Sequence, residues 1–294
     1  MKFISAVAGS LKNLRTCTLL LGASAFFISG DRPVSAETVY SFAVVPQQSA
    51  TRLAQVWVPF LKRLEQETGL KFKFTTAKDI PTFEACLSSK AYDFAYMNPY
   101  HYTVMHEVAG YEAFAHQAGR KLKGILVTRT DSAIKSLSDL NGDTIAFPSP
   151  AAFGASVIPR AELAARGVRF EPAYVKSHDS VYRAVALGVF PAGGGVRRTF
   201  GNIPNDLKSQ LRVFYETEAY TSHAFAAAPS VASQVREKVA EAMVAMADKS
   251  VLGPLGMSGF VRAGNEAWDD VRDLNLTAGQ TEIASEGEET CHSG

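Results

Sequence analysis

Cysteine is scarce in this sequence of 294 residues, which has only Cys17, Cys86 and Cys291. Cys17 lies within a stretch that has the features of a secretion signal, so two cysteines would remain in an exported chain. Two cysteines so far apart in the sequence are a weak indication of a disulfide, even in an oxidising compartment. Because Cys291 also lies in a polar tail, we expect both to be unpaired, with Cys86 as a small buried residue on a helix.

Long apolar runs are absent beyond the first 36 residues, which argues against a multi-pass membrane protein. Near the start, basic residues precede a short apolar run at Leu19–Ile28, and the small residues at positions 34–36 follow it. This order is typical of a cleavable signal peptide over residues 1–36, with cleavage near Ala36. We therefore expect the mature chain to begin near Glu37 and to lie in the periplasm. An uncleaved N-terminal anchor is the alternative.

Neither sign of charge is in excess. The chain has 30 Lys and Arg residues against 29 Asp and Glu residues, which gives a formal net charge of +1. Proteins that bind the phosphate backbone of a nucleic acid usually have basic residues concentrated in one surface patch. The nearly neutral composition therefore argues against a nucleic-acid partner.

The motifs of several enzyme classes are missing. The chain has no Gly-x-Ser-x-Gly elbow, no phosphate-binding Walker loop and no His-Glu-x-x-His zinc motif. Its glycine run at 193–195 follows a predicted helix and lacks the spacing of a dinucleotide-binding fingerprint. His101 and His106 do not share a helical face, and no cysteine or acidic partner completes a metal site. We therefore expect no catalytic activity, no metal and no cofactor.

Strand-like and helix-like segments alternate along the chain, which predicts an α/β fold with mostly parallel sheets. Apolar residues at helical spacing follow Ser49, and Gly69 is predicted to end that helix. Ser177 is predicted to cap another helix over 179–187. Strands are expected at 39–45, 70–75, 93–97, 123–129, 144–147, 173–175, 212–215 and 224–226.

The length that remains after the signal exceeds one typical core, so we expect two compact lobes. Residues 37–126 and 222–276 are predicted to form lobe 1, and residues 127–221 to form lobe 2. Because the chain then crosses between the lobes twice, we expect a hinge and a ligand site in the cleft between them. Residues 277–294 contain few apolar side chains and are predicted to be a disordered tail.

Six segments occur in an order and spacing that is similar to a known family. They are 49–59, 92–102 (YDFAYMNPYHY), 124–132, 145–160, 176–181 (KSHDSV) and 192–196 (AGGGV). On these segments the chain resembles the periplasmic substrate-binding proteins of ABC transporters for phosphonate, phosphite or phosphate. The resemblance extends from Val39 to Leu276 and implies the type II periplasmic-binding fold, with two α/β lobes and a hinged inter-lobe cleft.

Four loops follow strands and precede helices, where amide hydrogens point toward a ligand. In the first loop, Gln48 and Ser49 can donate to a ligand oxygen, and Ser49 is explained equally well as a helix cap. The second loop, at 96–102, leads into the next helix. Its tyrosines can line a ligand pocket, and the alternative for at least one of them is packing in the core. Its candidate ligand contacts are Tyr96, Asn98, Tyr100 and Tyr102, of which the resemblance assigns Tyr102 to a ligand-contacting position.

The third loop precedes the helix expected over 153–166. The family commonly carries a Ser-Thr-Ser-Gly run here, whose hydroxyls hold the anion. At the matching positions this chain has Ala152, Phe153, Gly154 and Ala155, so those hydroxyls are missing. Backbone amides and the helix dipole remain to favour an anion, and Ser156 is a candidate replacement for one hydroxyl. The large Phe153 predicts a ligand that is smaller, less charged or differently shaped.

The fourth loop contains His178, which the resemblance places at a ligand-contacting position. A neutral imidazole there can donate one hydrogen bond and accept another, and a capping or packing role is the alternative. Further along, Arg198 and Thr199 follow the glycine run, where binders of aminophosphonates carry an acidic residue. A basic side chain at this position would pair with a second negative charge on the ligand and would repel an amine.

Together these features predict a monomeric binding protein that captures a small oxyanion and delivers it to the permease subunits of an ABC importer. One alternative is a sensor that reports an oxyanion, such as phosphate or arsenite, to a sensor histidine kinase. In that case the thiol of Cys86 is a candidate contact for arsenite. A third alternative is an enzyme on the same fold, for which the sequence offers no visible nucleophile.

Overall fold

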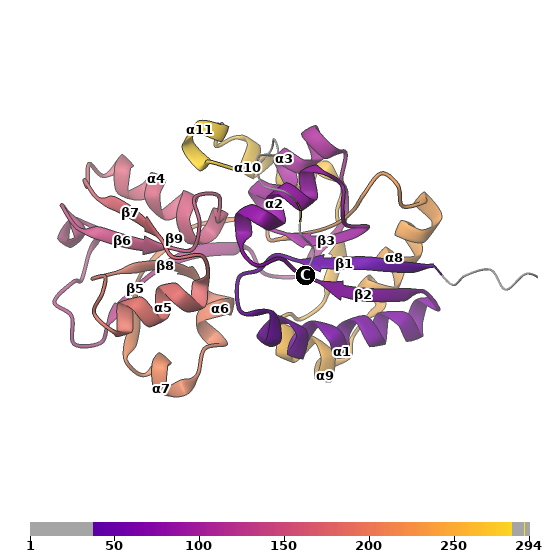
Figure 1. Cartoon of the computed structure of the whole chain (residues 1–294), viewed down its shortest axis with the longest axis horizontal. Coiled ribbons are helices and arrows are strands. Elements are labelled where there is room, and N and C mark those ends of the chain that lie inside the picture. Colours follow the sequence, from indigo (N-terminus) through magenta and orange to yellow (C-terminus); the bar gives the residue numbers. More distant parts are fainter. Residues whose placement is uncertain (1–37, 284–290, 292–294) are drawn as a thin grey trace, which may run out of the picture. The chain divides into compact units, whose positions relative to one another are not determined.

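The computed structural model describes residues 38–283 and Cys291. The expected signal peptide at 1–36 lies outside the described residues, as does most of the expected tail. The described chain forms one six-stranded and one five-stranded sheet, with helices on both faces of each (Figure 1). Within residues 38–283, no helix combines the length and the apolar composition that crossing a bilayer requires.

The six-stranded sheet has the strand order β11-β4-β10-β3-β1-β2. Its strands are β1 (Val39–Val44), β2 (Lys71–Thr75), β3 (Phe94–Met97), β4 (Glu112–Gln117), β10 (Ala224–Ala227) and β11 (Phe260–Arg262). On one face, α1 (Ala50–Thr68) packs with α8 (Ser233–Ala245) and α9 (Lys249–Leu255). On the other face lie α2 (Ile80–Ser88) and α3 (Pro99–Ala109), which pack together (Figure 1).

Helix α1 follows from its sequence as predicted. Ser49 caps its first turn by accepting a hydrogen bond from the Arg52 amide, and Gly69 ends it in the left-handed conformation that glycine adopts without strain. Trp57 on the buried face of the helix contacts Phe42 of β1, with ring centres 6.1 Å apart. Each such buried aromatic side chain contributes about 1.5–3 kcal/mol to folding through the hydrophobic effect.

The five-stranded sheet has the strand order β7-β6-β8-β5-β9. Its strands are β5 (Leu122–Arg129), β6 (Thr144–Phe147), β7 (Glu171–Tyr174), β8 (Gly193–Val196) and β9 (Leu211–Tyr220). A buried cluster that includes Ile125 and Val127 covers one face beneath α5 (His178–Ala186). Leu126, between them in the sequence, belongs to a second cluster on the face beneath α4 (Ile158–Ala165). This alternation is the two-residue period of a strand that is buried on both faces.

The strand directions bring several carboxyl ends to the place where the chain crosses between the sheets. The chain leaves the six-stranded sheet at the end of β4 and returns at the start of β10, so these strands run antiparallel. Met97 at the end of β3 pairs with Ala224 at the start of β10, and β1 runs parallel to β3. In the other sheet, Gly124 near the start of β5 pairs with Val196 at the end of β8, and β6 runs parallel to β8. The loops after β1, β3, β6 and β8 therefore all lie near the crossing.

Both sheets are mixed: most strands of each sheet run in one direction, as predicted, and the others run against them. The strands that run against the others are β10 and β11 in the six-stranded sheet and β5 in the five-stranded sheet, and of these β5 follows the first crossing and β10 follows the second. A chain that leaves a sheet and returns at the same edge has to reverse its direction there. All of β5 pairs within the five-stranded sheet, so the first crossing falls between Gln117 and Leu122.

The two distant cysteines form a disulfide between Cys86 on α2 and Cys291, so the expectation that both are unpaired is wrong. The prediction that Cys86 is a buried helical residue is confirmed. The start of the expected tail also differs, because α11 (Ala278–Thr281) is helical and the Ile283 side chain is buried in the core of the six-stranded sheet. The Thr281 hydroxyl donates to the Tyr100 hydroxyl at 2.9 Å. Composition alone does not reveal these anchors.

Removal of the disulfide is expected to destabilise the protein. Cys291→Ser should lower the free energy of unfolding by about 2–5 kcal/mol, because the unfolded chain regains the freedom that the cross-link removes. Urea denaturation of the oxidised mature protein, followed by circular dichroism, measures the difference. A reducing agent should bring the wild type to the stability of the variant and leave the variant unchanged. Equal stability of the two oxidised proteins would contradict the assigned bond.

Candidate functional site

The loop after β6 presents backbone donors at the start of a helix. A π-helical turn at Phe153–Val157 leads directly into α4. The Ala152 carbonyl accepts the amide of Ser156 at 2.7 Å, which fixes the turn. Within the described residues, the amides of Phe153, Gly154 and Ala155 make no hydrogen bond, as is usual for the first turn of a helix. Such amides and the positive end of the helix dipole favour an anion.

Glycines in the sheet allow this turn to lie directly on the strands. A Cβ atom on Gly194 would lie 1.9 Å from the Ala155 carbonyl oxygen. A Cβ atom on Gly124 would lie 2.1 Å from the Gly154 carbonyl oxygen. Because such distances are far shorter than van der Waals contact, only glycine fits at either position. The glycine run of β8 thus positions the helix start by packing against it.

His178 begins α5, and the Ser177 hydroxyl caps this helix as predicted by accepting the Ser180 amide. The His178 side chain is almost fully buried, and its Nδ1 lies 3.0 Å from the Thr199 hydroxyl. Burial, and secondly the charge of Arg198, lower the pKa of His178 to about 3. The imidazole is therefore neutral at physiological pH and can donate one hydrogen bond and accept another.

Gln47, in the loop after β1, joins three residues of the site. Its backbone carbonyl accepts the His178 amide at 3.0 Å, and its side-chain oxygen accepts a hydrogen bond from the Arg198 guanidinium. Its side-chain nitrogen lies 3.2 Å from Nε2 of His223. Since the amide nitrogen can only donate, Nε2 of His223 accepts, and the ring proton resides on Nδ1. Gln47 thus connects the six-stranded sheet with α5 and α6 (Arg197–Gly201) of the other sheet.

Arg198 places a positive charge beside both buried histidines. Its guanidinium lies 5.3 Å from the centre of the Tyr96 ring, within the range of a cation–π contact. Tyr96 in turn stacks on His223 with ring centres 4.9 Å apart. Burial, and secondly Arg198, hold the pKa of His223 well below its usual value. The arrangement combines one arginine with two neutral imidazoles.

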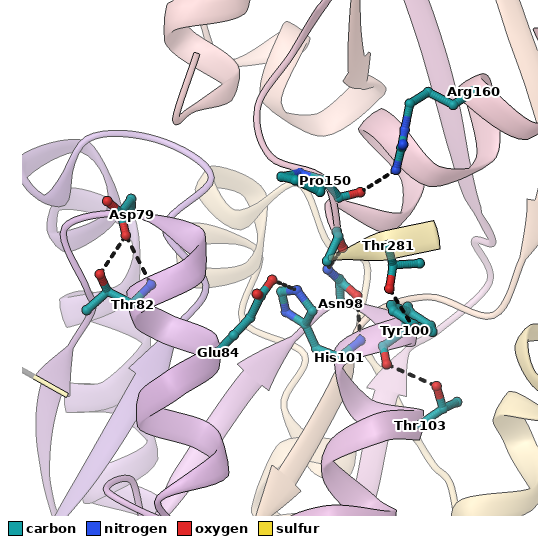
Figure 2. A network of polar contacts seen from close by, with 11 residues as sticks. Asp79, Thr82, Glu84, Asn98, Tyr100, His101, Thr103, Pro150, Arg160 and Thr281 are labelled. Carbon is teal, nitrogen blue, oxygen red and sulfur yellow. Dashed lines mark hydrogen bonds and ion pairs between the residues drawn. The ribbon is translucent and has the colours of Figure 1, made fainter. Parts of the chain in front are cut away.

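Asn98 links the loop after β3 to the loop after β6 (Figure 2). Its side-chain oxygen accepts the His101 amide at 2.8 Å and caps α3. Its side-chain nitrogen donates to the Ala151 carbonyl at 3.1 Å. Beside this cap, Nε2 of His101 lies 2.8 Å from a carboxylate oxygen of Glu84, and both side chains are fully buried (Figure 2). The orientation of Asn98 is therefore fixed by hydrogen bonds on both sides.

Two cavities adjoin at this junction. The smaller has a volume of about 10 Å³, and Gln47, Asn98, His178 and the turn at 152–155 line it. That volume accommodates about one water molecule. The larger has a volume of about 540 Å³, which is in the usual range for small-molecule sites. His223 and Val196 line both cavities, and Tyr96 and Arg198 line the larger one.

The structure brings some of the predicted site residues together. Five of them line the smaller cavity (Asn98, Ala152, Phe153, Gly154 and His178), and two line the larger one (Tyr96 and Arg198). Thr199 lines neither cavity, but its hydroxyl contacts His178. Ser156 also lines neither, and its hydroxyl accepts a hydrogen bond from Arg160 at 3.1 Å.

Other predicted residues lie elsewhere. Gln48 and Ser49 line a separate groove beside Asp179, to which the Gln48 amide donates at 3.3 Å. Tyr100 lines another groove and receives the hydrogen bond from Thr281 (Figure 2). The Tyr102 hydroxyl donates to Asn265 at 3.1 Å, and its fully buried ring packs on Trp268. Tyr102 thus has the contacts of a core residue.

Sequence reasoning missed Gln47 and His223 as candidate site residues. His223 immediately precedes the buried apolar strand β10, at the second crossing between the sheets. The sequence signal that could have identified His223 is the position of a polar residue directly before a buried strand that returns to the first sheet. In the described residues, no group of three or more His, Cys, Asp or Glu side chains is arranged to hold a metal ion.

Comparisons with known proteins agree on one family. Residues 42–268 match the family model for the phosphonate periplasmic substrate-binding protein of ABC transporters. The phosphate-import protein PhnD of Mycolicibacterium smegmatis is 26% identical over 227 residues, which are 69% of this chain and 70% of that protein.

Two solved structures show the same fold. A binding protein component of an ABC phosphonate transporter from Pseudomonas aeruginosa has a TM-score of 0.75 at 20% identity, covering 86% of this chain and 90% of that chain. PhnD1 from Prochlorococcus marinus, in complex with methylphosphonate, has a TM-score of 0.72 at 17% identity, covering 81% and 98%. The predicted type II periplasmic-binding fold is therefore confirmed.

Substitution of the β8 glycine tests how the helix start is held. Gly194→Ala should lower the free energy of unfolding by more than about 2 kcal/mol, because the new methyl group overlaps a backbone oxygen that cannot move aside. Gly201→Ala is the matched control, since a Cβ atom there meets no other atom within 4 Å. Urea denaturation measures both variants. If both alanines are tolerated equally, the turn does not rest on the strand as described.

The buried neutral histidine predicts a pH dependence of stability. The pKa of His178 is about 3 when folded, against about 6.5 when unfolded, so below pH 6.5 protons bind preferentially to the unfolded chain. This residue alone should therefore lower the free energy of unfolding by about 2 kcal/mol between pH 6.5 and 5.0. Urea titrations of the wild type and of His178→Asn at both pH values measure the difference. A His178 imidazole that titrates near pH 6.5 by NMR would contradict the prediction.

Proposed function

Because the chain belongs to the family of periplasmic phosphonate-binding proteins of ABC transporters, we propose that it binds a small oxyanion where α4 and α5 begin. The ligand is of phosphonate, phosphite or phosphate type. The observation that supports this position is the convergence of three unbonded amides at 153–155 with a neutral histidine and an arginine. Amide donors and one fixed positive charge match an anion that carries one or two negative charges.

Each group at the junction has a distinct part in this proposal. The amides of Phe153, Gly154 and Ala155 donate to the oxyanion in place of the hydroxyls that the sequence lacks. His178 donates from Nε2 when the Thr199 hydroxyl donates to its Nδ1, and it accepts from a protonated ligand oxygen in the other tautomer. Arg198, which lines the larger cavity, neutralises part of the negative charge of the oxyanion.

The site has to enlarge to admit this ligand. A tetrahedral oxyanion occupies several times the volume of the smaller cavity, which is about 10 Å³. The contacts that close the cavity, such as Gln47 with His178 and Asn98 with Ala151, join segments of the two different sheets. We therefore place a hinge at the two crossings, at 118–121 and 221–223, between lobes that correspond to the two sheets. A ligand that contacts both lobes would stabilise the closed state.

The partner in this proposal is the permease of an ABC importer, which the closed binding protein contacts as a monomer. Binding and release require no bond to be made or broken, so the protein performs no chemistry on its cargo. The predicted periplasmic location agrees with the family, whose members are periplasmic.

A thermal-shift series with the mature protein tests the proposal. At a hundredfold excess over the dissociation constant, a true ligand should add about 2.7 kcal/mol to the free energy of unfolding and raise the melting temperature by several degrees. The series contains phosphate, phosphite, methylphosphonate and arsenite, and sulfate and chloride are tested separately for comparison. If no phosphorus oxyanion shifts the melting temperature, the proposal fails.

The anion that responds should bind His178→Ala at least tenfold more weakly, as measured by calorimetry, because a buried hydrogen bond is lost. His106→Ala is the matched control, since this histidine lies on α3, lines none of the cavities described above and is partly exposed. Equal affinity of the wild type and His178→Ala would remove His178 from the site.

A further inference from the structure

The larger cavity is unusually rich in positive charge. Its lining includes five cationic side chains and one acidic one: Arg120, Lys121, Lys123, Arg197 and Arg198 against Glu216. Both crossings between the sheets contribute to its walls, through residues 119–121 and 222–223. The chain as a whole carries a formal net charge of only +1, so this is a local concentration of charge.

The acidic groups nearby leave part of this charge uncompensated. Glu216 forms an ion pair with Arg197 and also lies 4.0 Å from Lys123. Lys121 is 3.5 Å from Asp270, outside the cavity lining. Among the described residues, neither Arg120 nor Arg198 forms an ion pair, and Arg198 bonds instead to the neutral Gln47 amide. A cavity of this kind attracts anions.

The position of Arg198 joins this charge to the proposed oxyanion site. Arg198 lines the larger cavity, while Gln47, to which it donates, lines the smaller one. His223 and Val196 form a common wall of both spaces. Ser222 also lines the larger cavity, and its hydroxyl oxygen is buried without a hydrogen-bond partner in the described chain. A ligand held at the helix starts can therefore extend a substituent past His223 toward polar and cationic groups.

From this geometry we infer that the preferred ligand is a phosphonate with a second acidic group, such as a carboxylate, which occupies the larger cavity beside Arg198. The inference rests on the proposed oxyanion site and specifies the substrate class. A carboxylate there gains a charge-assisted hydrogen bond from the guanidinium. An ammonium group would meet the same positive field and be repelled. An uncharged alkyl group would be neither attracted nor repelled by this positive charge.

Three ligands of similar size test the inference by calorimetry: phosphonoacetate, ethylphosphonate and 2-aminoethylphosphonate. We expect phosphonoacetate to bind at least about tenfold more tightly than ethylphosphonate, and 2-aminoethylphosphonate to bind most weakly. The preference for phosphonoacetate should decrease as salt is added, because the cavity is open to solvent and its charges are screened.

Variants assign the effect to this cavity. In Arg198→Met, the affinity ratio between phosphonoacetate and ethylphosphonate should fall close to one. Arg120→Gln keeps the contact with Gln47 intact and should reduce the ratio by a smaller factor, which provides a second test if Arg198→Met folds poorly. Arg63→Gln, which removes a charge paired with Glu67 on α1, is the control and should leave the ratio unchanged.

The outcomes separate this inference from the proposed function. If ethylphosphonate binds and phosphonoacetate binds no more tightly, the inference is overturned and the oxyanion site remains. The same holds if 2-aminoethylphosphonate binds most tightly, or if the preference persists in both Arg198→Met and Arg120→Gln. If none of the three ligands binds and phosphate and methylphosphonate do not bind either, both the inference and the proposed function are overturned.

Discussion

The structure depends on one geometric constraint: the chain crosses twice between its two sheets at the same place, and these crossings determine the directions of the strands. The crossing strands β4, β5, β9 and β10 fix the direction of their neighbours through the sheet registers. As a result, β1, β3, β6 and β8 all end at that place, and the polar loops that follow them meet there. Residues that line the two cavities at this junction come from these loops and helix starts and from two further segments: Gln47, Asn98, the turn at 152–155, Arg198, His178 and His223.

Electrostatics at the junction favour an anion without a high net charge on the protein. Burial keeps His178 and His223 uncharged, so they provide hydrogen bonds and not positive charge. The positive charge comes from Arg198, whose guanidinium is held by Gln47 and by the ring of Tyr96. In the proposed function, hydrogen bonds and a small fixed charge together hold the anion, and release follows when the contacts between the sheets open.

Much of the fold could be predicted from local sequence signals. The helix from Ser49 to Gly69 and the cap at Ser177 follow from side-chain chemistry that acts over a few residues. The strand at 144–147 was predicted with the bounds that the structure has. The mixed strand directions could not be predicted in this way, because they depend on where the chain returns to a sheet.

The candidate site was less predictable because its contacts are between distant residues. Glycine has low strand propensity, so the run at 193–195 was not predicted as β8, and its packing against the turn at 153–155 was missed. The loop at 96–102 was assigned ligand-contacting tyrosines, whereas Tyr102 packs on Trp268 in the core. Cys86 and Cys291 are 205 residues apart, and no local pattern indicates that they meet. Gln47 and His223 are brought together only by the second crossing.

The central claim is that backbone amides at the start of α4 hold the oxyanion. Amide proton and nitrogen chemical shifts of Phe153, Gly154 and Ala155, recorded during a titration with methylphosphonate, test it most directly. The account predicts saturable downfield amide proton shifts at these three residues, with a fitted dissociation constant equal to the one found by calorimetry. Saturable binding with these three amide signals unchanged would contradict the account.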